Sequence, residues 1–149
     1  MSVLEEILGV ATPDVRAAVR WLLSQGALVV REDPPHGMAF AGLEFSIDGI
    51  TVRMVRDRGQ WMMDLRRGED RWLDFELLRL ACGGVAAYPA ARPAEASLPA
   101  QLPDGVSWRD ELPAVLVWLG SSRDAAELCA ALGRSRAAEL FPPKRDKGA

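Results

Sequence analysis

A chain of 149 residues, 49% hydrophobic and 26% charged, has the composition of one ordinary globular domain and is long enough to bury a substantial core. This composition excludes a chain that is disordered throughout, and no apolar run reaches the roughly 18 residues that span a bilayer. The net charge of −3 argues against a nucleic-acid binder, which usually carries a basic face.

The amino terminus and the two cysteines indicate a cytoplasmic protein. Glu5 and Glu6 occupy the region in which a secretory signal carries positive charge. Cys82 and Cys129 lie in apolar segments with helical spacing, where buried free thiols are commoner than disulfides. We therefore expect a single domain over residues 1–143, followed by a charged tail at 144–149.

Two helices are predicted at the amino-terminal end. Ser2 and Glu5 have the spacing of a capping box, in which each side chain satisfies an amide of the first helical turn. Thr12 as N-cap and Pro13 at the first helical position start a second helix, which Gly26 ends. The apolar residues of this second helix predict one buried stripe: Val15, Ala18, Val19, Leu22 and Leu23.

The middle of the chain changes from helical to alternating hydrophobicity. Four candidate strands lie at 27–31, 43–47, 50–55 and 60–65. Asp48-Gly49 is a two-residue hairpin signal, and Asp57-Arg58-Gly59 is a second turn. The pattern predicts an α+β fold, in which an antiparallel β-meander of three to four strands is covered on its apolar face by the flanking N- and C-terminal helices.

A helix is predicted after the sheet, over residues 72–82, where Leu73, Leu77 and Leu80 recur at helical spacing. The following segment, 86–105, is rich in proline and alanine. This composition is typical of an extended connection that runs over the surface.

Two more helices are expected at the carboxyl-terminal end, over residues 114–119 and 125–132. The first is placed there because Pro113 is tolerated best near the first turn of a helix, and the second ends before Gly133. Their predicted caps are Ser107 or Asp110 for the first helix, and a capping box of Ser121 and Asp124 for the second.

The sequence offers no credible catalytic or metal-binding constellation. His36 is the single histidine, and its Pro-Pro-His-Gly context favours an exposed loop side chain over a general base. One histidine and two distant cysteines do not have the spacing of a zinc site, and the glycine motifs that bind phosphates are absent. We expect no catalytic residue, no cofactor and no metal ligand.

Charged and aromatic residues gather where the last predicted strand leads into the next helix. The acids there are compatible with a divalent-metal or acid–base site, but the interleaved arginines favour a solvated face of mixed charge. Tryptophan and arginine are also the residues that dominate protein interfaces. The candidate partner-binding residues are Trp61, Asp64, Glu69, Asp70, Trp72 and Asp74.

The run from Ile50 to Leu65 contains an Arg-Gly-x-Trp turn at 58–61 and ends in Asp-Leu, and it is followed by Trp-Leu-Asp-Phe at 72–75. This order of strand, turn, strand and aromatic helix start resembles the central hairpin of small bacterial immunity proteins of polymorphic toxin systems. The resemblance implies a cytoplasmic antidote that binds one cognate toxin domain and occludes its active site. It implies a protein partner, with no nucleic-acid or membrane partner.

If the toxin is a nuclease or deaminase, acidic side chains of the antidote would mimic the phosphates of its substrate, because such toxins present basic clefts. The acids in question are Asp64, Glu69, Asp70 and Asp74. Two alternatives stay open. A secretion chaperone or adaptor would also be small and non-catalytic, but would expose a broad apolar dimer surface. A carboxylate-dependent hydrolase would need two acids that converge in a pocket.

Overall fold

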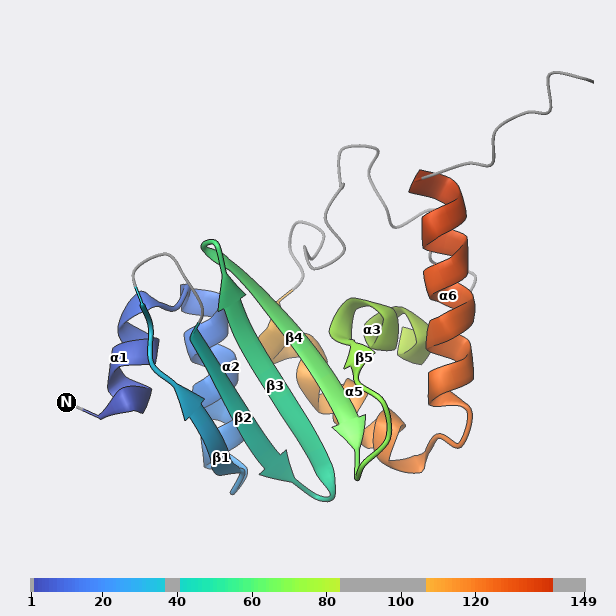
Figure 1. Cartoon of the computed structure of the whole chain (residues 1–149). Helices are drawn as coiled ribbons and strands as arrows, with labels where there is room; N and C mark the ends of the chain where they lie inside the picture. Colours follow the sequence, from blue (N-terminus) through green and yellow to red (C-terminus); the bar gives the residue numbers. More distant parts are fainter. Residues whose placement is uncertain (1, 37–40, 84–106, 141–149) are drawn as a thin grey trace, which may run out of the picture.

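The computed structural model describes residues 2–36, 41–83 and 107–140 of the chain. They form an α+β fold built on one antiparallel sheet (Figure 1). The strands follow one another across the sheet in sequence order: β1 (Leu28–Asp33), β2 (Ala41–Ile47), β3 (Ile50–Asp57), β4 (Gln60–Arg67) and β5 (Leu73–Asp74). The helices are α1 (Val3–Val10), α2 (Pro13–Ser24), α3 (Phe75–Gly83), α5 (Trp108–Ser121) and α6 (Ala125–Leu140).

The predicted antiparallel meander is confirmed, but its sheet contains five strands and not three to four. The additional strand is β5, which the sequence pattern places inside a helix over 72–82. Leu73 and Asp74 pair instead with β4. Helix α3 begins only at Phe75, because the Asp74 carboxylate accepts hydrogen bonds from two amides of the first helical turn and so acts as its N-cap.

The two amino-terminal helices start as predicted. The Glu5 amide donates to the Ser2 hydroxyl at 3.1 Å, and the Ser2 amide donates to the Glu5 carboxylate at 3.3 Å, which completes the capping box. Thr12 caps α2 by accepting a hydrogen bond from the Val15 amide. The predicted stripe of α2 is buried, except for Leu23, which is exposed near the end of the helix.

Two tight turns set the register of the central strands. Asp48-Gly49 joins β2 to β3 and Arg58-Gly59 joins β3 to β4, and all four residues have positive φ angles, between 49° and 80°. This is the geometry of two-residue hairpin turns whose twist matches that of the strands. The second turn places Arg53 of β3 directly opposite Asp64 of β4.

One face of the sheet forms the core with the helices. Alternate residues of β2, β3 and β4 are almost completely buried: Leu43, Phe45, Val52, Met54, Met63 and Leu65. Figure 1 shows α2 and α5 behind the sheet, α1 beside its β1 edge, and α3 and α6 on the side of its β5 edge. Leu22 of α2, Leu78 of α3 and Leu112 of α5 belong to the same cluster. The expectation that helices cover the apolar face is therefore confirmed.

Helix α5 begins earlier than predicted. Ser107 is its N-cap and accepts a hydrogen bond from the Asp110 amide at 3.0 Å, while the Trp108 amide donates to the Asp14 carboxylate of α2, also at 3.0 Å. Pro113 lies inside the helix. The predicted start near this proline is wrong, because the cap and the contact with α2 stabilise the first turns although the proline donates no backbone hydrogen bond.

The last helix differs from the prediction at both ends. The capping box of Ser121 and Asp124 does not form, because Ser121 is the last residue of α5 and its hydroxyl donates to the Val117 carbonyl at 3.1 Å. Helix α6 then passes through Gly133, its predicted end. A Cβ atom on Gly133 would lie 3.7 Å from Cδ1 of Leu77 in α3. Packing between these two helices therefore carries α6 past the glycine.

Two predicted regions, the connection at 86–105 and the tail at 144–149, lie outside the described residues. Within the described residues, the buried apolar side chains of the sheet and of the helices belong to one core cluster, with the exception of Ala41 in β2. No helix in these ranges is long and apolar enough to cross a membrane.

Candidate partner-binding surface

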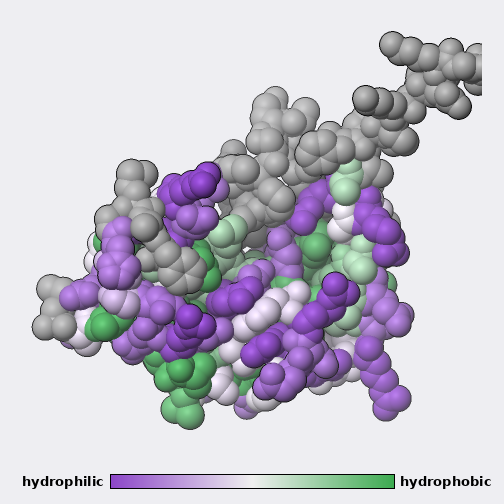
Figure 2. Space-filling view, in the orientation of Figure 1, coloured by the Kyte–Doolittle hydropathy of each residue, from purple (hydrophilic) through white to green (hydrophobic). Residues whose placement is uncertain are grey.

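The face of the sheet that points away from the helices carries half-buried side chains of mixed polarity. On β3 and β4 these are Thr51, Arg53, Val55, Met62, Asp64 and Arg66. Figure 1 shows no described helix in front of these strands, and Figure 2, in the same orientation, shows mainly hydrophilic side chains interspersed with side chains of intermediate hydropathy. We call these six residues together with Trp72 the open sheet face.

Trp72 is held on the open sheet face by two arginines. The guanidinium carbon of Arg53 lies 4.0 Å from the centroid of the Trp72 ring, and that of Arg66 lies 4.4 Å from it. Arg53 also forms an ion pair with Asp64, at 2.7 Å between Nη2 and Oδ2. We call these four residues the Trp72 cluster. An indole flanked by guanidinium groups has little rotational freedom left to lose, so binding a partner costs less entropy.

The charges of the Trp72 cluster are only partly compensated. Asp64 neutralises Arg53, whereas Arg66 has no ion pair among the described residues. The Nε atoms of both arginines are buried and lack a hydrogen-bond partner within the same part of the chain. The cluster therefore combines a large apolar ring with one excess positive charge, an arrangement suited to recognition of a protein surface.

The six predicted site residues do not share one location. Asp64 and Trp72 come together in the Trp72 cluster. Trp61 lies on the opposite face of β4 and packs, partly buried, against the core. Glu69 and Asp70 are exposed in the connection between β4 and β5.

Several of the predicted acids face arginines of the same chain, which weakens the idea of a free acidic patch that mimics phosphates. Asp64 pairs with Arg53, and Asp70 lies 3.8 Å from Arg67 Nε. Asp74 lies 3.9 Å from an amino group of Arg136. Arginines of the same chain therefore compensate the charge of these three carboxylates. Recognition by the open sheet face would depend more on Trp72, Arg53 and Arg66.

Asp74 stabilises the start of helix α3. Its Oδ1 atom accepts hydrogen bonds from the amides of Glu76 at 2.7 Å and Leu77 at 3.4 Å, at the start of α3. Burial raises the pKa of the Asp74 carboxyl, and this effect outweighs the opposing effects of Arg136 and of the two amide hydrogen bonds. This carboxylate caps a helix and faces α6, so its proposed contact with a partner loses support.

Replacing Asp74 with asparagine is expected to leave stability within about 0.5 kcal/mol of the unaltered protein near neutral pH, whereas alanine is expected to cost about 1 kcal/mol. Asparagine still caps α3 and carries no buried charge. Because the pKa of Asp74 is raised on folding, its ionisation costs stability above the unfolded-state pKa, and that cost disappears as the pH falls. The free energy of unfolding of Asp74→Asn, measured with urea and compared with that of the unaltered protein, should therefore be more favourable at higher pH than at lower pH. Equal losses for asparagine and alanine would contradict the capping role.

Arg53 and Arg66 are functional candidates that the sequence interpretation missed. The signal was present for Arg53, because counting five residues back from Arg58 and five forward from Gly59 reaches Arg53 and Asp64. Their pairing follows from a two-residue turn alone. The contact of both arginines with Trp72 had no such signal, since it depends on the path of the connection between β4 and β5.

The thiols and the histidine offer little chemistry. Both cysteines are free thiols; Cys129 is buried as expected, whereas Cys82 is only half-buried. Burial raises the pKa of Cys129 to about 12 and that of Cys82 above its usual value, so neither is a ready nucleophile. His36 is exposed. Among the described residues, no three histidine, cysteine or acidic side chains gather as a metal site.

The open sheet face therefore presents an aromatic ring, two guanidinium groups and a carboxylate close together on the sheet. These groups provide for recognition of another molecule by packing, by cation–π contact and by charge. No protein-family model matches the chain, and no curated protein or solved structure matches it either.

Proposed function

We propose that the protein is a non-catalytic protein-binding module, and specifically an immunity protein that acts in the cytoplasm by binding one cognate bacterial toxin domain and occluding its active site. The observation that carries the binding role is the Trp72 cluster on the open sheet face. Tryptophan and arginine are enriched among the residues that dominate binding energy, above all where the partner excludes water from them at the centre of an interface. The identity of the partner as a toxin is supported by the resemblance of residues 50–65 and 72–75 to immunity-protein hairpins.

The size of the whole outward side of the sheet, of which the open sheet face is a part, sets how far such a partner would extend. Four strands spaced about 4.8 Å apart, each about seven residues long at roughly 3.3 Å per residue, give a projected area of roughly 400 Å². A stable interface of standard size takes about 800 Å² from each partner. The partner would therefore also contact neighbouring segments, and the exposed connection with Glu69 and Asp70 is adjacent to the cluster.

The proposal is tested with toxin domains encoded next to this gene, by copurification and then by isothermal titration calorimetry. Replacing Trp72 with alanine is expected to weaken binding at least about 30-fold, which corresponds to the 2 kcal/mol or more that truncation of a dominant interface residue costs. Thr51→Arg, which adds a long charged side chain to the open sheet face without entering the core, is expected to weaken binding similarly.

The matched control is Val117→Ala on α5, because Val117 is an exposed apolar residue of a helix on the other side of the sheet. This variant is expected to bind as the unaltered protein does. Folding of each variant is checked by circular dichroism. Full affinity of folded Trp72→Ala and Thr51→Arg would remove the open sheet face from the interface. Failure of every neighbouring toxin domain to bind the unaltered protein would count against the immunity role itself.

A further inference from the structure

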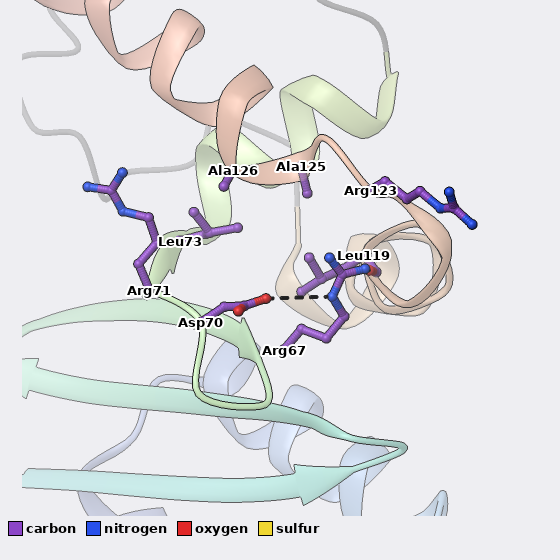
Figure 3. A pocket seen from close by; sticks show the side chains of 8 residues that line it. All are labelled: Arg67, Asp70, Arg71, Leu73, Leu119, Arg123, Ala125 and Ala126. Atoms are coloured by element: carbon purple, nitrogen blue, oxygen red, sulfur yellow. Dashed lines mark hydrogen bonds and ion pairs between the residues drawn. The ribbon is translucent and has the colours of Figure 1, made fainter.

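A pocket of about 290 Å³ lies where the connection between β4 and β5 meets the junction of α5 and α6 (Figure 3). Leu73 of β5 belongs to its wall, whereas its neighbour Trp72 lies on the open sheet face. The two sites are therefore neighbours at the start of β5, since Trp72 directly precedes this strand. The pocket is near the lower end of the size range of small-ligand sites, which hold roughly 300 to 1,000 Å³.

The floor of the pocket is apolar and firmly packed. Leu119 and Ala125 are 1% and 2% exposed, Leu73 is 9% exposed, and Ala126 is half-buried. Figure 3 shows the side chains of Leu73, Ala125 and Ala126 directed toward the space between the three segments. A short aliphatic group placed on this floor would leave water and gain roughly 0.8 kcal/mol for each buried methylene.

The rim of the pocket is basic. Three arginines, Arg67, Arg71 and Arg123, line it together with one acid, Asp70, although the whole chain has a net charge of −3. Asp70 lies 3.8 Å from Arg67 Nε and so offsets that arginine. The excess positive charge at the opening therefore belongs to Arg71 and Arg123.

Arg67 makes one wall of the pocket rigid. Its Nη1 atom donates to the carbonyl of Leu119 at 3.1 Å and to the carbonyl of Ser122 at 2.6 Å, and so caps the end of α5. These bonds tie β4 to the junction of α5 and α6. The pocket is consequently formed before any ligand binds. The conformational entropy lost on binding would come mainly from the side chains of Arg71 and Arg123.

Arg71 and Arg123 are available to a ligand. Both side chains are exposed, and neither has an ion pair or a hydrogen bond among the described residues. Figure 3 shows their guanidinium groups at opposite ends of the opening, turned outward. Both side chains are long and exposed, and each would rotate from the position in Figure 3 toward the opening to contact an anion seated there. Ala125 and Ala126 open helix α6, so the positive end of its dipole adds to the same potential.

We propose that this pocket binds a carboxylate attached to a branched aliphatic group, with the aliphatic group on the apolar floor and the carboxylate between Arg71 and Arg123. Leucine with a free carboxylate and a blocked amino group has this chemistry. The same chemistry is presented by a small free acid or by the carboxyl-terminal residue of a polypeptide. The site is separate from the open sheet face, and its test requires no toxin.

The test is a titration of the full-length, nitrogen-15-labelled protein with N-acetyl-leucine, followed by nuclear magnetic resonance. Saturable shifts are expected for the amide signals of Leu73, Ala125 and Ala126, with a Kd on the order of 1 mM, as befits so small a ligand. N-acetyl-leucinamide has the same aliphatic group without the charge, and N-acetylglycine has the charge without the aliphatic group. Each is expected to bind at least about fivefold more weakly.

The matched variants separate charge from shape. Arg71→Gln combined with Arg123→Gln is expected to weaken binding of N-acetyl-leucine about tenfold and to leave the affinity for N-acetyl-leucinamide unchanged. The double variant is expected to fold normally, because both side chains are exposed and make no structural contact among the described residues. Arg134→Gln, an exposed arginine of α6 that does not line the pocket, is expected to change nothing. Equal binding of acid and amide, or absence of saturable shifts at these three amides, would overturn the proposal.

The source of the carboxylate is distinguished with a short peptide that ends in leucine. If the peptide binds at least as tightly as N-acetyl-leucine, and its amidated form does not, the ligand is a polypeptide carboxyl terminus. If N-acetyl-leucine binds and the peptide does not, the ligand is a small free acid.

Discussion

Replacement of Arg136 with methionine is expected to lower the free energy of unfolding by about 3 to 5 kcal/mol near neutral pH, because it removes the cation that faces the buried Glu76 carboxylate and the half-buried Asp74 carboxylate. Arg136 of α6 lies 3.6 Å from Glu76 and 3.9 Å from Asp74, both at the start of α3. The Arg136 and Glu76 side chains are only 13% and 8% exposed. Methionine fills a similar length, so the loss reports on charge and not on a cavity.

The deficit of the Arg136→Met variant is expected to depend on pH. Burial already raises the pKa of the Asp74 carboxyl, and Arg136 opposes that rise, so the pKa of Asp74 rises further in the folded state without the arginine. A group whose pKa is raised on folding costs stability above its unfolded-state pKa, and acidification relieves that cost. Urea unfolding at about pH 7 and about pH 5 should therefore show a smaller deficit at the lower pH.

The control for this prediction is the double variant Arg136→Met with Glu76→Gln, which removes the buried negative charge of Glu76 together with the cation that faces it. It is expected to recover part of the lost stability, because a neutral amide costs less to bury than a carboxylate whose neighbouring cation has been removed. A deficit below about 1 kcal/mol, or one that does not change between the two pH values, would show that the arginine is not the principal partner of these carboxylates.

The other large effect is expected in the core. Phe45 of β2 has no exposed surface and is among the largest fully buried side chains of the chain. Truncation to alanine removes the ring and leaves a cavity, so Phe45→Ala is expected to cost about 3 to 5 kcal/mol. The midpoint of urea unfolding measures this loss, with an unchanged slope if the two-state transition is kept.

The neighbouring residue provides the control for the core prediction. Ser46 follows Phe45 in β2 and points to the other face of the sheet, where it is half-buried. Ser46→Ala is expected to change stability by no more than about 0.5 kcal/mol. Comparable losses at the two positions would contradict the assignment of one face of the sheet to the core and the other to the open sheet face.

Where a structure depends on residues near one another in the chain, the sequence predicts it well. The capping box of Ser2 and Glu5 and the N-cap Thr12 form as expected, because they need only three or four neighbouring residues. The turns at Asp48-Gly49 and Arg58-Gly59 also form, and with them the register that joins Arg53 to Asp64. Alternating hydrophobicity between these turns was enough to identify the core face of the sheet.

Contacts between distant segments decided what the local patterns did not. Helix α6 continues through Gly133 because α3 packs against it, and α5 begins before Pro113 because Asp14 of α2 accepts a hydrogen bond from its first turn. In both cases the free energy of tertiary packing exceeds a local penalty of about 1 to 3 kcal/mol for glycine or proline in a helix.

The candidate site shows the same division. Sequence alone determined that Trp72 and Asp64 lie near the end of a β-meander, and it proposed both as contact residues. Only the tertiary structure decided that Trp61 turns toward the core, that Asp74 caps a helix, and that two arginines flank Trp72. The physical reason is that packing on each side determines which face of β4 is buried and whether β5 pairs with it. The segments that pack there are far apart in the chain, so the hydrophobic periodicity of the sequence does not reveal them.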